Sequence, residues 1–339
     1  MKLRRVRLPG GAGFSVASQH DDEGLPLRPA LELHRTRGGT ASPELEAASG
    51  DIVAFLQGGA NLRAQATELL TTLQPVMAKN HRAFEPDALL PFHPLSFRDF
   101  MLYERHAIDA ARGLVRRFMP RVRPLVAAYE RATKRTFPAL RPKKLWYERP
   151  IYYMGNHLSF VPDGATIPWP SYTKALDYEL ELGLVIAHPV RNATPEDAIA
   201  AIGGFVVVND FSARDVQYPE MNSGFGPVKA KNFASGLGAV VVTADEILPR
   251  VENLDVEVKV NGKTWSTGHT AGMRYPLWEV VAYASLGEQL LPGELIATGT
   301  IPGCSGMEVG KWLSPRDEIE LSIAGVGTLR NVIGAPKTA

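Results

Sequence analysis

The sequence predicts an α+β fold: a mixed, mainly antiparallel β architecture over the C-terminal two-thirds, preceded by a smaller N-terminal domain. Glycine and proline, 31 and 26 residues of 339, make up about a sixth of the chain, which is typical of many short strands joined by turns. The apolar runs YELELGLVIAHPV and GGFVVVND are strong strand patterns. Asn261-Gly262, between two alternating runs, is the usual sequence of a type I′ hairpin.

Composition excludes several functional classes. The 37 basic and 36 acidic residues give a net charge of +1, so no overall field attracts nucleic acid or an anionic membrane. The single cysteine, Cys304, excludes an internal disulfide and a thiolate metal cluster and suits a reducing compartment. No apolar stretch reaches the roughly 18 residues that span a bilayer, and Met1 to Arg7 is not followed by the apolar run of a signal peptide. We therefore expect a cytoplasmic protein that acts on a small molecule.

The N-terminal part is predicted to combine strands and helices. The first 40 residues read as short strands that include VRL, FSV and LELH. Ser42-Pro43 is an N-cap followed by a first-turn proline, and apolar residues recur at helical spacing from Leu62 to Leu73, before Pro75. The run EPDALLPFHPL has three prolines in eleven residues, so we place a domain boundary near residue 90. The predicted domains are an N-terminal α+β domain, 1–90, and a catalytic domain, 91–339.

The catalytic part begins with a helical pattern and continues in strands. From Ser96 to Tyr129 the spacing is helical with breaks at Pro120 and Pro124. Its basic side chains are predicted to form a solvated helix face rather than a binding patch: Arg116, Arg117, Arg121 and Arg123. Residues 276–290 predict a short amphipathic helix, and LIATGT and EIELSIAGVGTLRNVI predict strands.

Glu179 and Glu181 stand two residues apart in an apolar strand, so both carboxylates leave on one face while Leu180 and Leu182 point the other way. An exposed strand face is the ordinary interpretation of such a pair. The alternative is a divalent cation such as Mg²⁺ or Ca²⁺, whose charge removes the repulsion between the carboxylates. The apolar run that follows indicates a buried strand, and buried carboxylates require compensation.

Three further acidic residues and a histidine stand at predicted element ends. Asp210 ends an apolar strand, where it either opens a turn or projects into a cleft around the strand ends. Asp99 and Asp215 each lie three residues after a serine, in the pattern of a capping box that begins a helix. His106 follows Asp99 by seven residues, a spacing that places both on one face of a helix, although a lone histidine is more often structural.

The segment LIATGTIPGCSGME predicts a strand that runs into a glycine-rich turn. Gly299, Gly303 and Gly306 allow a positive φ and bring backbone N–H groups close to a ligand. The spacing to Lys311 excludes a Walker A loop. Glu308 and Lys231, taken singly, read as ordinary surface residues.

Together these segments resemble the fumarylacetoacetate hydrolase family. The matching strings run from about residue 147 to 334, with an upstream match from Asp99-Phe100 through His106. They are DYELELGLVI, GGFVVVNDFSARDVQ, the lysine of KNF, VNGKTWSTGHT, LLPGELIATGTIPG and GVGTLRNVIG. The resemblance implies the family's C-terminal fold for this region.

The resemblance also implies roles for individual residues. The positions that match the family's divalent-metal carboxylates are Asp99, Glu179, Glu181 and Asp210. The catalytic histidine position falls on His106, the glutamate that orients it on Glu308, and the metal-site lysine on Lys231. The substrate-contacting positions are Tyr153, Gln217 and Thr300.

The chain departs from the family pattern at three places. The connection between His106 and Pro150 is longer than usual, helical and rich in arginine, so the family's substrate-binding arginine has no assigned position. Ala230 replaces the glycine that usually precedes the lysine. The turn between Thr300 and Glu308 is shorter than in the largest members.

The implied activity is that of a metal-dependent hydrolase that cleaves a carbon–carbon bond in an acylpyruvate-like or 1,3-diketone substrate. The expected cofactor is Mg²⁺, with Ca²⁺ or Mn²⁺ as alternatives, which binds both oxygens of the substrate. His106, held by Glu308, would take a proton from water, and Lys231 with N–H groups of the glycine turn would face the developing oxyanion. We expect a homodimer, from the resemblance and from the prevalence of two-fold assemblies.

Two other functions stay open at this point. One keeps the fold and the metal but changes the reaction to 2-oxo acid decarboxylation or enol–keto isomerisation, neither of which needs an attacking water. The other is a non-catalytic protein that binds a small oxo acid. The presence of all four candidate carboxylates favours the enzymatic alternatives.

Overall fold

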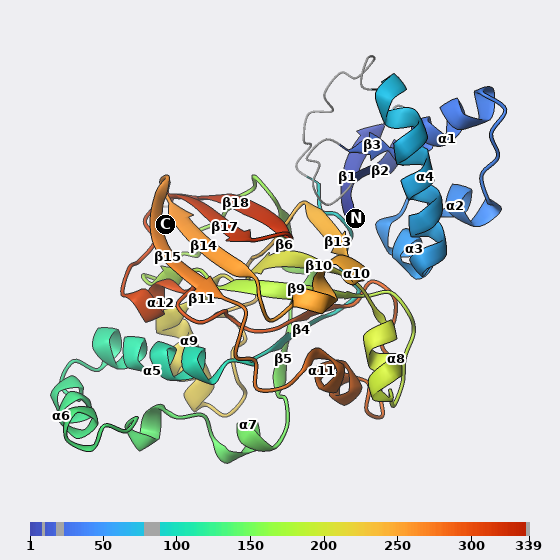
Figure 1. Ribbon diagram of the computed structural model, residues 1–339. Helices are drawn as coiled ribbons and strands as arrows, with labels where there is room; N and C mark the ends of the chain where they lie inside the picture. Colours follow the sequence, from blue (N-terminus) through green and yellow to red (C-terminus); the bar gives the residue numbers. More distant parts are fainter. Residues whose placement is uncertain (9–10, 18–23, 78–88, 337–339) are drawn as a thin grey trace.

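The computed structural model describes residues 1–8, 11–17, 24–77 and 89–336. The described residues form a central sheet of eleven strands, which extends in Figure 1 from β1–β3 at the upper right to β5 below the centre. The strand order is β3-β2-β1-β13-β10-β9-β16-β4-β5, with β12 beside β10 and β6 beside β12. The strands are β1 (Lys2–Leu8), β2 (Gly11–Ala17), β3 (Leu25–Pro26), β4 (Phe97–Phe100), β5 (Tyr152–Gly155), β6 (Phe160–Pro162), β9 (Leu180–Ile186), β10 (Ile202–Asn209), β12 (Ser235–Leu237), β13 (Val240–Thr243) and β16 (Leu295–Ala297).

A second sheet packs against the first, with the order β15-β14-β17-β18-β7. Its strands are β7 (Thr166–Ile167), β14 (Asp255–Val260), β15 (Lys263–His269), β17 (Glu318–Ile323) and β18 (Gly327–Ile333). Asn261 and Gly262 join β14 to β15 with φ values of 51° and 70°, which confirms the predicted hairpin turn. Most strand pairs in both sheets are antiparallel, so the predicted α+β fold class is confirmed.

Strands β9 and β10 have no exposed face, because each lies between two apolar cores. Leu180, Leu182 and Leu184 of β9 belong to the core under the five-stranded sheet, whereas Val185 belongs to the core shared with the N-terminal helices. Alternation with period two sends successive side chains to opposite faces, so apolar residues on both parities bury both faces. A charged side chain at the end of β9 or β10 is therefore buried unless a pocket connects it to solvent.

The N-terminal helices are α1 (Leu27–Thr36), α2 (Pro43–Ala48), α3 (Ile52–Gln57) and α4 (Gly59–Met77). The Ser42 hydroxyl caps α2 as predicted, by accepting a hydrogen bond from the Leu45 N–H at 3.1 Å. The prediction of a strand at LELH is wrong, because this run lies in α1, where Leu27, Ala30 and Leu31 are buried at helical spacing. Helix α4 also continues past Pro75 to Met77.

The N-terminal segment extends the central sheet. Strand β1 pairs with β13 in antiparallel register, with Lys2 opposite Val242, and the Met1 ammonium group lies 3.0 Å from a Glu246 carboxylate oxygen. The first four residues of EPDALLPFHPL, 85–88, lie outside the described residues. The division into domains at residue 90 stays a prediction.

The remaining α-helices cover the sheets and form an arm at the lower left of Figure 1. They are α5 (Glu104–Phe118), α6 (Arg123–Thr133), α7 (Lys144–Glu148), α8 (Pro195–Ala200), α9 (Arg214–Asn222), α10 (Ala244–Ile247), α11 (Leu277–Ala284) and α12 (Gly306–Val309). Short 3₁₀ turns occur at η1 (Pro138–Leu140), η2 (His157–Ser159) and η3 (Leu248–Arg250). None of the helices within the described ranges is long and apolar enough to cross a membrane.

Both predicted capping boxes are wrong, although a helix follows each of them: α5 from Glu104 and α9 from Arg214. Asp99 does not open a helix: it lies in β4, between β16 and β5, and α5 begins five residues later at Glu104. Ser212 does not cap a helix either, because Ser212 and Ala213 form the short strand β11, which pairs with β8 (Leu176–Asp177). In both cases the serine-containing pattern is local, whereas the partner strands lie far away in the chain and decide the conformation.

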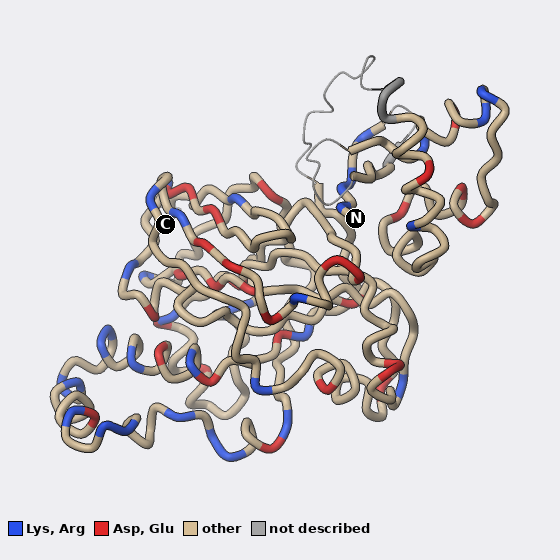
Figure 2. The backbone as a smooth tube through the Cα atoms, viewed as in Figure 1, with Lys and Arg blue, Asp and Glu red and all other residues tan. Residues whose placement is uncertain are grey.

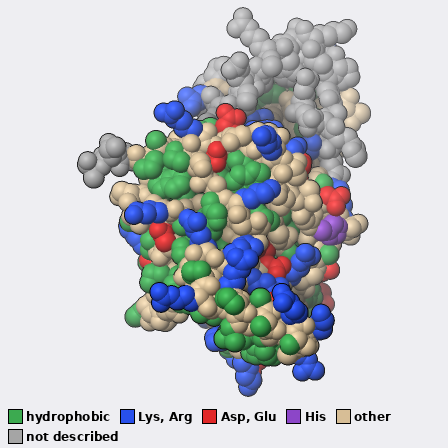
Figure 3. Space-filling view, turned by 90° about the vertical axis from the view of Figure 1, so that its left-hand side faces the viewer, with side chains coloured by type: hydrophobic (Ala, Val, Ile, Leu, Met, Phe, Trp, Pro, Cys, Tyr) green, Lys and Arg blue, Asp and Glu red, His purple; other side chains and the backbone are tan. Residues whose placement is uncertain are grey.

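The arm is built from α5, α6 and η1 around a small core of Val115, Val126 and Leu140. Figure 2 shows many blue segments along it, and Figure 3, which views the molecule from the left-hand side of Figure 1, shows many basic side chains in its lower half. Arg116, Arg117, Arg121 and Arg123 are all exposed, which confirms the predicted solvated face. The Arg116 side chain nevertheless also forms hydrogen bonds outside the arm, with backbone carbonyl groups of α12.

We expect Gly299→Ala to destabilise the protein more than a matched glycine substitution. Gly299 has a φ of 80°, and an added Cβ would lie 2.4 Å from the carbonyl oxygen of Phe100. Gly287 has a similar φ of 74° but no atom within 4 Å of the added Cβ. Urea denaturation should show a loss of about 1–2 kcal/mol for Gly287→Ala from backbone strain alone, and about 2–5 kcal/mol for Gly299→Ala. Equal losses would contradict the close backbone approach.

Candidate active site

Three carboxylates from strands β4, β9 and β10 meet on one face of the central sheet. Asp99 comes from β4, Glu181 from β9, and Asp210 directly follows β10. Their exposed fractions are 5, 1 and 0 %. One carboxylate oxygen from each lies within 4.8 Å of the others. The structure therefore brings together three of the four predicted metal carboxylates, in a spacing that one ion can bridge.

The triad, defined as Asp99, Glu181 and Asp210, has a buried oxygen on each member with no hydrogen-bond partner. Burial, and then repulsion from Asp210, raise the pKa of Asp99 well above its usual range. Burial, and then repulsion from Asp99, do the same to the pKa of Glu181. Carboxylate oxygens are the ligands that Mg²⁺, Ca²⁺ and Mn²⁺ prefer. The triad thus fits a divalent cation, which would satisfy the unpartnered oxygens and the excess negative charge.

Lys231 and Glu179 lie beside the triad. The buried Lys231 ammonium group contacts the carboxylates of both Glu179 and Asp210. Burial opposes the charge on Lys231, but attraction to Asp210 and Glu179 outweighs it and raises the pKa of Lys231. Glu179, the fourth predicted metal carboxylate, is therefore ion-paired and lies outside the cluster of three. Burial works against its charge as well, yet Arg214 and Lys231 lower the pKa of Glu179.

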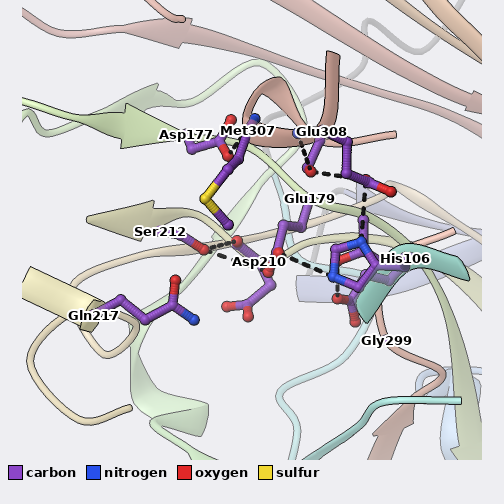
Figure 4. Close-up of polar contacts among 12 residues, drawn as sticks. His106, Asp177, Glu179, Asp210, Ser212, Gln217, Gly299, Met307 and Glu308 are labelled. Carbon is purple, nitrogen blue, oxygen red and sulfur yellow. Dashed lines mark hydrogen bonds and ion pairs between the residues drawn. The ribbon is translucent and has the colours of Figure 1, made fainter. Parts of the chain in front are cut away.

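His106 and Glu308 form a pair next to these carboxylates (Figure 4). The Nδ1 atom of His106 lies 3.0 Å from Oε2 of Glu308, and its Nε2 atom lies 3.7 Å from Oε1 of Glu179. Burial disfavours the charged imidazole, but the Glu308 carboxylate outweighs it and raises the pKa of His106. One ring nitrogen therefore lies at ion-pair distance from Glu308, and the other lies toward Glu179.

Glu308 is itself held on the glycine-rich turn. Its Oε1 atom accepts a hydrogen bond from the Gly303 N–H at 3.0 Å, and its Oε2 atom accepts one from the Ser305 hydroxyl at 2.8 Å. Gly299 and Gly303 have the predicted positive φ, at 80° and 82°, but Gly306 does not, because it is the first residue of α12. The N–H groups of Gly303 and Gly306 donate to carboxylates of the protein, so the expectation that they face a substrate is wrong for this structure.

Arg214 and Asp177 are two site residues that the sequence analysis missed. Arg214 is buried and donates from Nε to Asp177 at 2.8 Å, from Nη2 to Glu179 at 2.7 Å and from Nη1 to Gln217 at 2.9 Å. Asp177 also accepts hydrogen bonds from the N–H groups of Gly306 and Met307. A signal for Asp177 was present, because it precedes Glu179 by two residues and so shares its parity. Arg214 was hidden by the capping-box interpretation of its neighbours.

The predicted substrate-contacting residues line the same region. The Tyr153 hydroxyl donates to Asp210 at 2.8 Å, and the Thr300 hydroxyl lies 3.4 Å from Oε1 of Glu181. Gln217 accepts from Arg214, as described above. Asp215, interpreted as structural, accepts hydrogen bonds from the Thr173 hydroxyl and the Lys174 N–H. The ten predicted site residues therefore assemble in one place, and their roles in chemistry stay proposals.

Comparisons with known proteins agree on one family. The family described as fumarylacetoacetate (FAA) hydrolase C-terminal matches residues 126–334. An uncharacterised protein of Pyrococcus abyssi is 30% identical over 188 residues, 55% of this chain and 80% of that protein. The mitochondrial oxaloacetate tautomerase of Pongo abelii is 29% identical over 188 residues, 56% of this chain and 82% of that protein.

Solved structures show the same fold along the whole chain. The fumarylacetoacetate hydrolase of Exiguobacterium antarcticum superposes with a TM-score of 0.61 at 22% identity, covering 99% of both chains. The 2-hydroxyhepta-2,4-diene-1,7-dioate isomerase of Mycobacterium marinum superposes with a TM-score of 0.61 at 20% identity, covering 100% of both. At these identities the likeness concerns the fold alone.

We expect Mg²⁺, Mn²⁺ or Ca²⁺ to stabilise the protein through the triad. A ligand at about 100 times its Kd adds about 2.7 kcal/mol, which corresponds to a rise in Tm of several degrees. Glu181→Gln should abolish this rise and leave the metal-free protein at least as stable, because the substitution removes a repelled buried charge. Glu196→Gln, on the exposed surface of α8, is the control. A cation-dependent rise that survives Glu181→Gln would place the ion elsewhere.

We also expect the metal-free protein to lose stability as pH rises above the ordinary carboxyl pKa values of 3.8 and 4.5. The pKa values of Asp99 and Glu181 lie above their ordinary values of 3.8 and 4.5 in the folded state, so the folded chain keeps protons that the unfolded chain has released. Folding then takes up protons, and the free energy of unfolding falls with rising pH. The raised pKa of His106 acts in the same direction. Urea titrations with a chelator should show this slope, and Glu181→Gln should reduce it; a flat or rising profile would contradict it.

Proposed function

We propose, from the premise that this chain belongs to the fumarylacetoacetate hydrolase family, that it is a metal-dependent hydrolase of a carbon–carbon bond in an acylpyruvate-like or 1,3-diketone substrate. One observation carries the proposal: His106 Nδ1 lies 3.0 Å from the Glu308 carboxylate, while Nε2 lies 3.7 Å from the Glu179 carboxylate beside the triad. This is the arrangement of a general base with an orienting acid, which hydrolysis by water requires.

The triad, with Glu179 beside it, would hold the cation. When bound there, a divalent ion polarises the two oxygens of a 1,3-diketone or 2-oxo acid. The unpartnered oxygens of the triad support this role, because each has a lone pair directed at no donor of the described residues. Tyr153 and Thr300, which contact Asp210 and Glu181, would keep those two carboxylates in position.

The protein's side chains would perform the proton transfers. His106 takes a proton from water, and the resulting hydroxide adds to the carbonyl carbon next to the scissile bond. Lys231, which stays charged between Glu179 and Asp210, stabilises the negative charge that develops on the oxygen. The carbon–carbon bond then breaks, its electron pair passes to the leaving enolate, and protonated His106 returns the proton to the carbon. The products are a carboxylate and a ketone or 2-oxo acid.

A second candidate is keto–enol tautomerisation of a 2-oxo acid. It is favoured by the 29% identity to an oxaloacetate tautomerase over 82% of that protein. This reaction uses the same cation site and needs no attacking water. It therefore depends less on the His106 and Glu308 pair and more on the carboxylate cluster with Lys231.

The two reactions are separated by assaying one set of variants for both. The purified protein with Mg²⁺ should release pyruvate and a carboxylic acid from at least one member of an acylpyruvate panel. His106→Ala should lower this rate by about 10²–10⁴-fold, since a general base is lost. Glu308→Gln should lower it less, because the base remains but loses its orientation. His188→Ala, an exposed histidine, is the matched control and should act like the unchanged protein.

Tautomerisation of oxaloacetate, followed by loss of enol absorbance, is measured on the same samples. Cation binding with no product from any acylpyruvate would reject the hydrolase, and tautomerisation that persists in His106→Ala would then establish the second candidate. Hydrolysis that is unchanged in His106→Ala would reject the assigned base.

A further inference from the structure

The turn that carries Glu308 is stabilised by hydrogen bonds from residues elsewhere in the chain. Helix α12 has only four residues, too few for a helix that is stable without tertiary support. Its N-terminal N–H groups, from Gly306 and Met307, donate to Asp177 at 2.8 and 3.0 Å. Its C-terminal carbonyl groups therefore need partners as well, and the position of Glu308 depends on them.

Those partners come from the arm. Nη2 of Arg116 donates hydrogen bonds to the carbonyl oxygens of Met307 at 2.8 Å and Glu308 at 2.9 Å. The helix ends at Gly310 in the left-handed conformation, and a Cβ added there would lie 3.2 Å from the same nitrogen. A cation over the terminal carbonyls is favourable both as a hydrogen-bond donor and in the field of the helix end.

Backbone contact reinforces this grip. Gly113, one turn before Arg116, packs so closely that an added Cβ would lie 2.1 Å from the Met307 carbonyl oxygen. Helix α5 therefore reaches α12 without an intervening side chain. The same helix carries His106 as its third residue. Helix α5 thus carries the His106 imidazole near its N-terminal end and contacts the turn that bears Glu308 near its C-terminal end.

We propose that Arg116 is a positioning residue that sets the separation between His106 and Glu308. The expected effect of Arg116 on catalysis rests on the proposed function. Its effect on the distance between His106 and Glu308 does not. Asp177 grips the opposite end of α12, yet it also pairs with Arg214, which holds Glu179, so its substitution disturbs several groups. The hydrogen bonds of Arg116 within the described residues go to α12 alone, which makes it the selective probe.

The kinetic test compares Arg116→Ala and Arg116→Lys with Arg117→Ala. Arg117 is the adjacent exposed arginine and stacks on Trp312, with its guanidinium carbon 5.0 Å from the ring centroid. Arg116→Ala should lower kcat for the preferred acylpyruvate by about 10–100-fold, as expected for a misplaced catalytic group, with KM changed less than about two-fold. Arg116→Lys should recover part of the loss, and Arg117→Ala should stay within about two-fold of the unchanged protein.

A double-mutant cycle shows whether Arg116 acts through Glu308. Added to Glu308→Gln, Arg116→Ala should cause little further loss, because the group that it positions is already gone. Losses that multiply would overturn the inference, as would an unchanged kcat in Arg116→Ala.

A structural measurement keeps this test apart from the activity. Crystal structures of the unchanged protein and of Arg116→Ala should show the distance from His106 Nδ1 to Glu308 Oε2 lengthened in the variant. If no acylpyruvate is hydrolysed but the distance lengthens, the proposed function fails and the positioning role stands. An unchanged distance overturns the positioning role whatever the activity. Should Arg116→Ala not fold, the same comparison is made with Arg116→Lys, in which the bond to at least one of the two carbonyls should be lost.

Discussion

Repulsion among three buried carboxylates is the constraint on which the site depends. Asp99, Glu181 and Asp210 share one sheet face, and buried negative charges of this density require compensation by cations or protons. Lys231 supplies one positive charge directly, and Arg214 supplies another one step further away through Glu179. The remaining deficit of positive charge is what suits this position to a cation rather than to an ordinary polar core.

Charge compensation also connects the triad with the pair of His106 and Glu308. Glu179 contacts Lys231 on the triad side and His106 on the other, and Arg214 joins Glu179 to Asp177. Asp177 holds the start of the turn that bears Glu308, which returns to His106. The contacts close into a ring in which the backbone of α12 links Glu308 to Asp177. Movement of the carboxylates and of His106 is therefore coupled through directional bonds rather than through apolar packing alone.

The sequence predicted those parts of this arrangement that local periodicity determines. Strands β9 and β10, the hairpin at Asn261-Gly262 and the common face of Glu179 and Glu181 follow from period-two patterns and turn chemistry. The convergence of residues distant in sequence came from the family resemblance, which the comparisons confirm. Local patterns failed where pairing decides: Asp99 sits in a strand because β16 and β5 lie on either side of it. Arg116 looked like a solvated side chain because its partners lie about 190 residues away.

Strand β16 has a consequence for how the protein matures. It lies between β9 and β4, pairing Ala297 with Gly183 on one side and with Asp99 on the other. Asp99 and Glu181 are thus brought into register by a segment that leaves the ribosome after both of them. A nascent chain that has emerged only as far as α11 still lacks the strand that joins them, so the three carboxylates can converge only after β16 has been synthesised.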